Sequence, residues 1–504
     1  MSCFAQTLAV LMLLFGAAFP GVAQAADQPQ WGERYSRNQI TTETGLPDSF
    51  DPDSGRNVKW VAELGTSTYS TPVVGGGCVL IGTNNGDPRD PRRKGDRGVL
   101  MCFDERDGRL LWQLVVPKRS EDAFLDWPNT GITGAATVEG DRVYLVNNRN
   151  EVMCLDLHGL ANGNDGPFTD EARHAEPAGA PPVALGPLDA DILWLFNTPV
   201  ELGVHNHDSA CNSPLICGDF LYVATGNGVD RTHRKILAPD APSLLVLNKH
   251  TGRLVAVDGE RMGPRTIHSS WSSPSAGEVN GRTLVFFGGG DGVVYAFAAV
   301  KSEGVEAAAK PFTLKKVWWF DCDPTAPKEN VHAWQDNFKD GPSNISGMTV
   351  FHQNRVYVTA GGDVWHGKPH AWLKCIDATR AGDVTHSGEI WSFPLNGHCL
   401  STPAIKDGLV YVTDLSGEIN CVDDRTGRLV WKHKAGGEIW SSTLVAGDKL
   451  FVGTQQGELL TLVAGREKKL TATSEVPGAI NATPVAANGT LFVASMGRLY
   501  AIKP

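Results

Sequence analysis

The sequence predicts an all-β protein, an eight-bladed β-propeller built from four-stranded antiparallel blades. The first basis for this prediction is a repeated sequence motif. It begins with a small residue followed by Thr-Pro, and continues after a Gly-containing turn with an apolar run. It then has Cys, an apolar residue and Asp, and it ends with Gly-Arg-Leu-x-Trp. Its clearest copies run from Ser70 to Trp112 and from Ser401 to Trp431. The second basis is spacing, because the last three copies begin about 40 residues apart, the length of one blade. Such a repeat cannot bury both faces of its sheet alone, so stacking around an axis is expected.

The first strand of the repeat can be found eight times. Its copies begin near Ser70, Gly134, Asn212, Ser272, Ser346, Ser401, Ser441 and Asn481. Alternating apolar second strands, such as residues 143–146 and 410–412, follow after tight turns that suit hairpins. Each copy is counted as one blade; seven blades is the alternative if one divergent copy is miscounted.

The two ends of the repeat array predict how the ring closes. The final copy stops at a third strand, residues 499–502, and no Trp-bearing fourth strand follows it. A strand of that missing type, residues 57–64 with Trp60, stands alone near the N-terminus. We expect it to complete the last blade, which seals the ring and leaves no free sheet edge.

The N-terminus carries the features of an export signal. Residues 1–25 contain no charge, and an apolar run from Leu8 to Phe19 precedes the small-residue pattern Ala23-Gln24-Ala25. This run is too short to span a bilayer, and Cys3 is misplaced for a lipobox. The sequence therefore predicts a Sec-type signal peptide at 1–25, an N-terminal extension at 26–56, a propeller at 57–504, and a soluble periplasmic or secreted protein. The net charge of −11 disfavours nucleic acid and anionic membranes as partners.

The cysteines follow the repeat rather than a disulfide framework. Cys102, Cys154, Cys375 and Cys421 occupy the same slot in four third strands. Slots related by rotation about a ring lie beyond bridging distance, so these four are interpreted as small core residues. Cys211 and Cys217 flank one first strand, and the sequence leaves open whether they pair.

The segment from Cys421 to Trp431 resembles the tryptophan-docking repeat of the quinoprotein (PQQ-like) eight-bladed propellers. Cys102 to Trp112 is a second copy, and Leu247 to Ala256 is a third that has lost its Trp. The resemblance covers nearly all of the chain after Asn57 and is strongest to exported PQQ-like repeat proteins. It implies that the Trp rings pack between adjacent blades and that the Gly forms the turn before the outer strand.

The resemblance also implies where cofactor chemistry would lie. Quinoprotein alcohol dehydrogenases hold PQQ and Ca²⁺ with an Asn, acidic ligands and an Asp base beside a Trp, commonly with a disulfide between adjacent cysteines. Residues 224–228 resemble the segment with the ligand Asn, and 268–272 resemble the segment around the Trp. Ser270 and Ser272 stand where those enzymes have acids, and the sequence contains no adjacent cysteines. PQQ and Ca²⁺ are therefore not favoured, and no catalytic residue is assigned.

Long insertions predict the binding face. They fall mostly in the loops between second and third strands and in the blade-to-blade connections, which emerge on one face of a propeller. The candidate ligand-binding residues in these loops are His205, His207, Asn227, His268, Trp271, Trp365, His366, His398 and Trp440. The alternative is that they satisfy one another at the mouth of the ring. A metal site at His205 and His207 would need ligands from other blades, so metal binding stays open.

Two classes of function follow from these patterns. The first is an exported, non-catalytic scaffold that binds an envelope protein, a polysaccharide or a small ligand on its inserted face. The alternative is a PQQ-dependent oxidoreductase of alcohols or sugars with a degenerate site. The serines beside Trp271 favour the scaffold, and whether the protein is an enzyme is left open.

Overall fold

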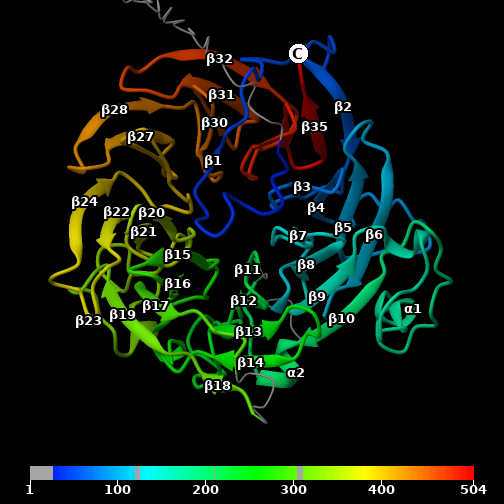
Figure 1. Ribbon diagram of the computed structural model, residues 1–504, viewed down its shortest axis with the longest axis horizontal. Coiled ribbons are helices and arrows are strands. Elements are labelled where there is room, and N and C mark those ends of the chain that lie inside the picture. The colour runs from blue at the N-terminus through cyan, green and yellow to red at the C-terminus, as the bar shows by residue number, and fades with distance from the viewer. Residues whose placement is uncertain (1–25, 120–124, 209–210, 304–309) are drawn as a thin grey trace, which may run out of the picture.

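Eight sheets arranged in a ring make up the protein (Figure 1). This computed structural model describes residues 26–119, 125–208, 211–303 and 310–504. Seven of the sheets have four antiparallel strands from one stretch of the chain, and three of these sheets also have a short parallel strand. The eighth sheet combines both ends of the chain. Eight blades are therefore confirmed and the seven-bladed alternative is wrong. The signal peptide predicted at residues 1–25 lies outside the described residues.

The blades follow one another around the ring, each running from an inner to an outer strand (Figure 1). The first four blades are β3 to β6 (Val73–Gly75, Cys78–Asn84, Arg97–Asp104, Leu110–Pro117), β7 to β10 (Thr137–Glu139, Arg142–Val146, Glu151–Asp156, Ile192–Asn197), β11 to β14 (Leu215–Cys217, Phe220–Ala224, Leu244–Asn248, Leu254–Val257), and β15, β16, β17 and β19 (Ser275–Val279, Arg282–Gly288, Val293–Ala298, Lys316–Asp321). The next three are β20, β21, β22 and β24 (Val350–His352, Arg355–Gly361, Ala371–Asp377, Glu389–Leu395), β25 to β28 (Ala404–Lys406, Leu409–Thr413, Glu418–Asp423, Leu429–Lys434), and β29 to β32 (Leu444–Ala446, Lys449–Gly453, Glu458–Val463, Leu470–Glu475). The last blade is β33, β34 and β35 (Val485–Ala487, Thr490–Ala494, Arg498–Ile502) with β2 (Val58–Glu63).

Few other elements are present. Short strands β1 (Ile40–Thr41), β18 (Phe312–Thr313) and β23 (Gly382–Asp383) add in parallel to β29, β14 and β19. The helices with described bounds are α1 (Glu171–His174), α2 (Thr198–Leu202) and the 3-10 turns at Gly159–Ala161, Gly263–Arg265 and Val331–Trp334. Within the described part of the chain, every helix is too short or too polar to cross a bilayer.

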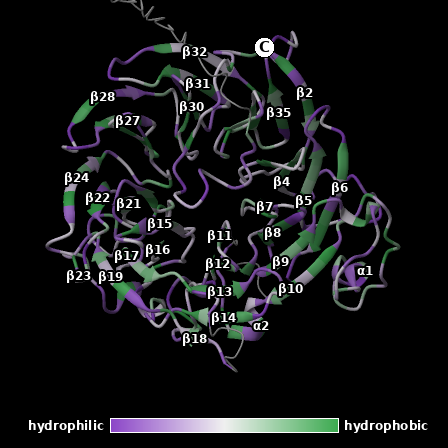
Figure 2. Ribbon diagram, in the orientation of Figure 1, coloured by the Kyte–Doolittle hydropathy of each residue, from purple (hydrophilic) through white to green (hydrophobic). Residues whose placement is uncertain are grey.

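The middle strands of each blade are apolar because both of their faces are covered. Every residue of β4 and β5 is buried, and the same holds for β12 and β26. Figure 2 shows hydrophobic stretches along blade strands such as β5, β9 and β10. A sheet packed on both sides reads as a continuous apolar run, which is the pattern that these strands show in the sequence.

Tryptophans on the outer strands join six of the eight blades to the next blade. The indole N–H of Trp112 donates to the carbonyl of Leu157 in the following blade, at 2.8 Å. The rings of Trp60, Trp194, Trp318, Trp391 and Trp431 make the equivalent bond, at 2.8 to 3.1 Å. A Cβ added to Gly427 would lie 2.7 Å from the ring of Trp391, so only glycine fits this turn, which also has a φ of +66°. The packing expected from the quinoprotein-type repeat is confirmed.

The cysteine slot lies directly opposite the docking tryptophan. Cys102 pairs with Trp112 in the sheet, Cys375 with Trp391, and Cys421 with Trp431. All four slot cysteines are fully buried, in agreement with a core role. No disulfide joins Cys211 to Cys217 or any other pair of the described cysteines.

The predicted closing strand completes the last blade. Strand β2 pairs antiparallel with β35, with Trp60 opposite Ala501 and Glu63 opposite Arg498. Trp60 is 8% exposed, and its ring lies 5.9 Å from that of Phe492. The N-terminal strand therefore holds the C-terminal blade in the ring.

The segment before β2 has a role that the sequence did not reveal. Residues 26–39 run along the innermost strands, and their carbonyls accept hydrogen bonds from the backbone amides of Val74, Val138, Ala276, Phe351, Val445 and Asn488. Asn38 exchanges two hydrogen bonds with Ile405, both 2.8 Å long. Arg37 reaches the remaining blade, where it donates to the carbonyls of Ser213 and Pro214. This inner segment contacts all eight blades.

Arg37 is the buried centre of these contacts. Its side chain is fully enclosed and donates to four backbone carbonyls and one hydroxyl, at 2.9 to 3.3 Å. Burial lowers the pKa of the guanidinium to about 9. Among the described residues no carboxylate pairs with it, so the carbonyl dipoles are its stabilising partners.

Replacing Trp60 tests the closure of the ring. Trp60→Ala removes a large buried side chain from the seam and should lower the free energy of unfolding by about 3 to 5 kcal/mol. Urea denaturation followed by fluorescence measures the change. Val61→Ala is the matched control, because Val61 neighbours Trp60 on the same strand but is 42% exposed. Equal effects of the two substitutions would contradict the closing role of Trp60.

Replacing Arg37 tests the inner segment. Arg37→Ala leaves several buried carbonyls without donors, and we expect a loss of about 3 kcal/mol or more in unfolding free energy. Arg34→Ala is the control, since Arg34 is exposed and its ion pair with Glu139 lies at the surface; its loss should cost about 0 to 1 kcal/mol. If Arg37→Ala were as mild as Arg34→Ala, the segment would not stabilise the ring.

Candidate functional site

Four histidines from four different loops meet at one place in the ring. His207 lies in the connection before β11, His233 in the β12–β13 loop, His268 in the connection before β15, and His366 in the β21–β22 loop. The centroid of the His233 ring lies 4.5 Å from that of His207, 4.9 Å from that of His268 and 4.5 Å from that of His366. We call these four side chains the histidine cluster. All four loops belong to the insertions that were expected to share one face.

His207 is buried, and its ring has a defined orientation. Its Nδ1 lies 2.8 Å from the carbonyl oxygen of Val229. A carbonyl can only accept, so Nδ1 carries the hydrogen and Nε2 of the neutral ring faces the cluster. Nε2 lies 2.9 Å from Nε2 of His233 and 3.3 Å from Oδ1 of Asp208. Burial lowers the pKa of His207 to about 4, so its ring is neutral near pH 7.

His268 is oriented by a buried carboxylate. Its Nδ1 lies 3.1 Å from Oδ2 of Asp363, and Asp363 also accepts from the side chain of Asn344 and from the amides of Trp365 and His366. Burial alone would lower the pKa of His268, but the charges and hydrogen bonds of Asp363 and Asp208 outweigh it and raise the pKa to about 9. Nε2 of His268 points into the cluster, 3.5 Å from Oδ2 of Asp208.

Tryptophans cover one side of the histidine cluster. The ring of Trp271 lies 4.7 Å from His268, and the ring of Trp365 lies 5.5 Å from both. Trp440 follows, 6.4 Å from Trp365. Trp365 is 44% exposed, so the cluster adjoins the protein surface beside this ring.

The structure brings together most of the residues that were proposed to bind a ligand. His207, His268, Trp271, Trp365 and His366 are in mutual contact, and Trp440 is next to them. Of the remaining three, Asn227 and His398 bind the backbone through their side chains, and His205 takes part through its backbone amide. The side chain of Asn227 accepts from the amide of His205 and donates to the carbonyl of Ala238, and His398 contacts the carbonyl of Gly362. Ligand binding by any of the nine stays a prediction.

Three functional candidates escaped the sequence reasoning. His233 is one polar residue in a long loop, and nothing in its neighbours marks it. Asp208 follows His207 directly, so the run His205-Asn206-His207-Asp208 held a usable signal. Asp363 lies two residues before Trp365, but its burial and its contact with His268 are visible only in the fold.

Comparison with known proteins places the chain in a family. The sequence profile of the family described as outer membrane protein assembly factor BamB matches residues 44–162 and 326–504, more than half of the chain. The chain belongs to the BamB family. Over 93 residues it is 29% identical to the outer membrane protein assembly factor BamB of Salmonella typhimurium, which covers 18% of this chain and 23% of that relative. The match therefore spans about a quarter of the relative's length.

Solved structures share the ring. BamB from Moraxella catarrhalis superimposes with a TM-score of 0.51 at 14% identity, covering 88% of this chain and 96% of that chain. A quinohemoprotein alcohol dehydrogenase from Pseudomonas putida gives a TM-score of 0.56 at 11% identity, covering 95% and 80%. At these identities the likeness concerns the fold alone. Both confirm the propeller fold, and the family match adds that its repeats are PQQ-like.

At the described positions that resemble the enzymes' ligands, this BamB-family chain does not offer a donor set for PQQ and Ca²⁺. The hydroxyl of Ser270 accepts from the amide of Gly290, and that of Ser272 donates to the carbonyl of Gly347. The amide group of Asn227 is likewise engaged with the backbone at both of its polar atoms. Ca²⁺ requires several oxygen ligands, carboxylates above all. The residues at the positions that resemble the enzymes' ligands therefore do not fit this cofactor.

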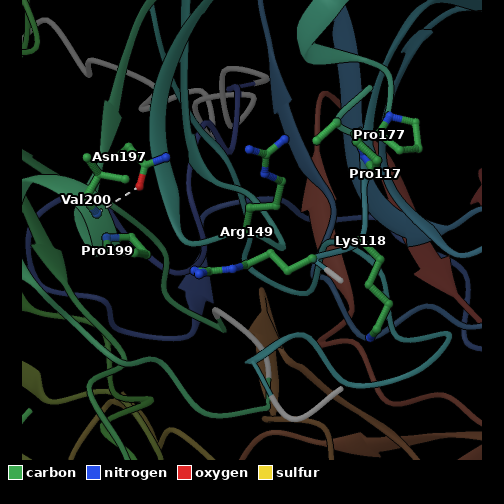
Figure 3. Close-up of a pocket in the computed structure, with 9 residues that line it drawn as sticks. Pro117, Lys118, Arg149, Pro177, Asn197, Pro199 and Val200 are labelled. Atoms are coloured by element: carbon green, nitrogen blue, oxygen red, sulfur yellow. Dashed lines mark hydrogen bonds between the residues drawn. The ribbon is translucent and has the colours of Figure 1, made fainter. Parts of the chain in front are cut away.

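A surface pocket lies elsewhere, between the first two blades (Figure 3). Its lining includes Pro117, Lys118, Arg149, Pro177, Asn197, Pro199 and Val200. Its basic groups have acidic neighbours, since Lys118 lies 3.8 Å from Asp96 and Arg149 lies 3.3 Å from Glu151. None of the candidate residues lines it, so the histidine cluster remains the better site.

A buried acid beside the cluster's loops predicts a pH dependence. The carboxyl of Asp126 contacts Asn148 at 2.7 Å, and burial raises its pKa to about 7. The folded state then binds this proton more tightly than the unfolded state, so the contribution of Asp126 to stability falls as pH rises from about 4 to 7. Asp126→Asn should remove that slope, measured as unfolding midpoints across this range. The exposed Asp141→Asn is the control and should keep the slope; an unchanged slope in Asp126→Asn would contradict the prediction.

Proposed function

We propose that this BamB-family chain is an exported, non-catalytic scaffold that binds a partner protein of the cell envelope on its insertion-rich face. The proposal includes a periplasmic or secreted location. Membership of a family described as an outer membrane protein assembly factor supports a protein partner over a polysaccharide or a small ligand. The engaged side chains of Ser270, Ser272 and Asn227 support a role without quinone chemistry.

The main support for a protein partner is a group of exposed apolar side chains in the loops around the histidine cluster. Trp127, Leu237, Phe338 and Trp365 are 45%, 50%, 58% and 44% exposed, and each lies in a different inserted loop. We call these four residues the apolar rim. Large apolar and aromatic side chains gathered at a surface mark sites of protein association, where such residues are enriched.

Hydrogen bonds between the loops hold the apolar rim around one centre. The amide of Trp127 donates to the carbonyl of Asp208 at 2.7 Å, and that of Val229 donates to His268 at 2.9 Å. The amide of Asp336, two residues from Phe338, donates to His366 at 3.0 Å. Each of these loops is thus tied to a loop that carries a cluster residue. A rim fixed in this way presents a defined surface and orders few side chains on binding, which favours affinity.

Site-specific cross-linking tests the proposed face. A photo-reactive amino acid at Leu237 or Phe338, in the full-length protein expressed in its native host, should give a discrete adduct with one envelope protein identified by mass spectrometry. The same amino acid at Leu429 or Leu470 is the matched control, because these residues are similarly exposed but lie on outer strands. The physical reason is that only groups within an interface lie close enough to the partner to react.

Two outcomes would contradict the proposal. Adducts formed equally from the outer-strand positions would show that the inserted face is not the docking surface. Tight, stoichiometric uptake of PQQ with Ca²⁺, followed by dye reduction with an alcohol or sugar, would favour the oxidoreductase alternative. We expect neither, because the side chains at the corresponding positions are hydrogen-bonded to the backbone.

A further inference from the structure

The histidine cluster contains a set of donor atoms that the family match does not assign. His207, His233 and His268 all lie between the two matched segments, in residues 163–325. We propose that Nε2 of His207, His233 and His268, together with the carboxylate of Asp208, bind one divalent transition-metal ion. This site goes beyond the proposed scaffold function.

Distances between the donor atoms fit a single ion. One ligand atom from each of the three histidines lies within 4.8 Å of the others. Nε2 of His207 is 2.9 Å from Nε2 of His233, and the oxygens of Asp208 lie 3.3 Å and 3.5 Å from Nε2 of His207 and His268. Around a tetrahedral ion with bonds of about 2.0 to 2.1 Å, neighbouring ligands are about 3.3 Å apart. Small side-chain movements therefore complete the shell.

Hydrogen bonds at the far nitrogens already orient two of the rings. Nδ1 of His207 faces the carbonyl of Val229, and Nδ1 of His268 faces Asp363. A histidine that binds a metal commonly donates its other N–H to a carbonyl or a carboxylate, which fixes the ring and makes Nε2 a better ligand. Asp363 is itself held by Asn344 and two backbone amides. This support is built before any ion binds.

An unsatisfied nitrogen gives an independent indication. His268 is only 2% exposed, and its Nε2 makes no hydrogen bond of normal length, since the carboxylate oxygen Oδ2 of Asp208 that faces it lies 3.5 Å away. This atom points into the same space as the other donors. Buried polar atoms normally have a hydrogen-bond partner at a shorter distance, and the 3.5 Å separation of Nε2 and Oδ2 fits an ion that both atoms bind. A metal ion bound to Nε2 takes the place of the proton on this nitrogen, which is released on binding.

The donor types select the class of ion. Imidazole nitrogens with one carboxylate suit Zn²⁺ and neighbouring first-row ions, whereas Ca²⁺ takes oxygen ligands throughout. Four protein ligands around one ion form a closed shell, which is typical of structural rather than catalytic zinc. The ion would join three inserted loops, the two that carry His207 and His233 at the third blade and the one that carries His268 before the fourth. Its role is to rigidify the insertion-rich face.

Metal titration of the full-length mature protein tests the site. Protein stripped with a chelator should bind one equivalent of Co²⁺ with visible absorption of a four-coordinate ion, and Zn²⁺ should displace it. His207→Ala, His233→Ala and His268→Gln should each weaken Zn²⁺ binding by about 100-fold or more. Asp363→Asn should weaken it about 10- to 100-fold through the orientation of His268. His205→Ala is the matched control, two residues from His207 in the same loop, and should bind as the unmodified protein does.

The least disruptive variant, His233→Ala, gives the decisive test of the site. His233 is half-buried in an exposed loop, so His233→Ala should fold, which circular dichroism checks. If this variant binds Zn²⁺ as tightly as the His205→Ala control, or if the unmodified protein takes up no stoichiometric Co²⁺, the cluster is held by hydrogen bonds alone. The titration needs no partner protein, so its outcome is independent of the cross-linking experiment.

Discussion

A four-stranded sheet that is apolar on both faces is stable only when neighbours cover both, and this constraint governs the molecule. The blades meet it through outer-strand tryptophans, each of which fills the wedge to the next blade and donates to its backbone. Glycine turns such as Gly427 make room for the ring of the preceding blade. Because every blade needs two neighbours, the array is complete only as a closed circle, and β2 supplies the strand that closes it.

The inner segment adds a second constraint at the centre of the ring. Residues 26–39 connect the innermost strands through backbone hydrogen bonds, which require extended chain but few particular side chains. Arg37 is the exception, because its five donors satisfy carbonyls from several parts of the ring at once. One N-terminal stretch therefore stabilises the ring in two places. Residues 26–39 contact the innermost strands of the blades, and residues 58–63 complete the last blade.

The rigid ring allows its loops to form a site. Inserted loops from successive blades place His207, His233 and His268 within one ion's reach, although 61 residues separate the first from the last. The same loops carry the apolar rim, and shared hydrogen bonds couple the two. A metal ion that joins these loops would hold the apolar rim in one conformation. A surface that is already fixed loses less conformational entropy when a partner binds, which would explain why polar and aromatic side chains gather on this face.

The periodic sequence by itself determined the ring: strand order, eight blades, the tryptophan seam and the closing strand all follow from local patterns that recur. It also indicated the face and most of the cluster, because insertions and their His and Trp residues stand out against a regular repeat. Only the tertiary structure decided the rest. The inner segment, His233 and the link from Asp363 to His268 depend on contacts between residues far apart in the chain. Such contacts are not visible in the repeat pattern, because each occurs only once in the chain. Which two residues meet depends on the closed ring and not on the residues next to them in the sequence.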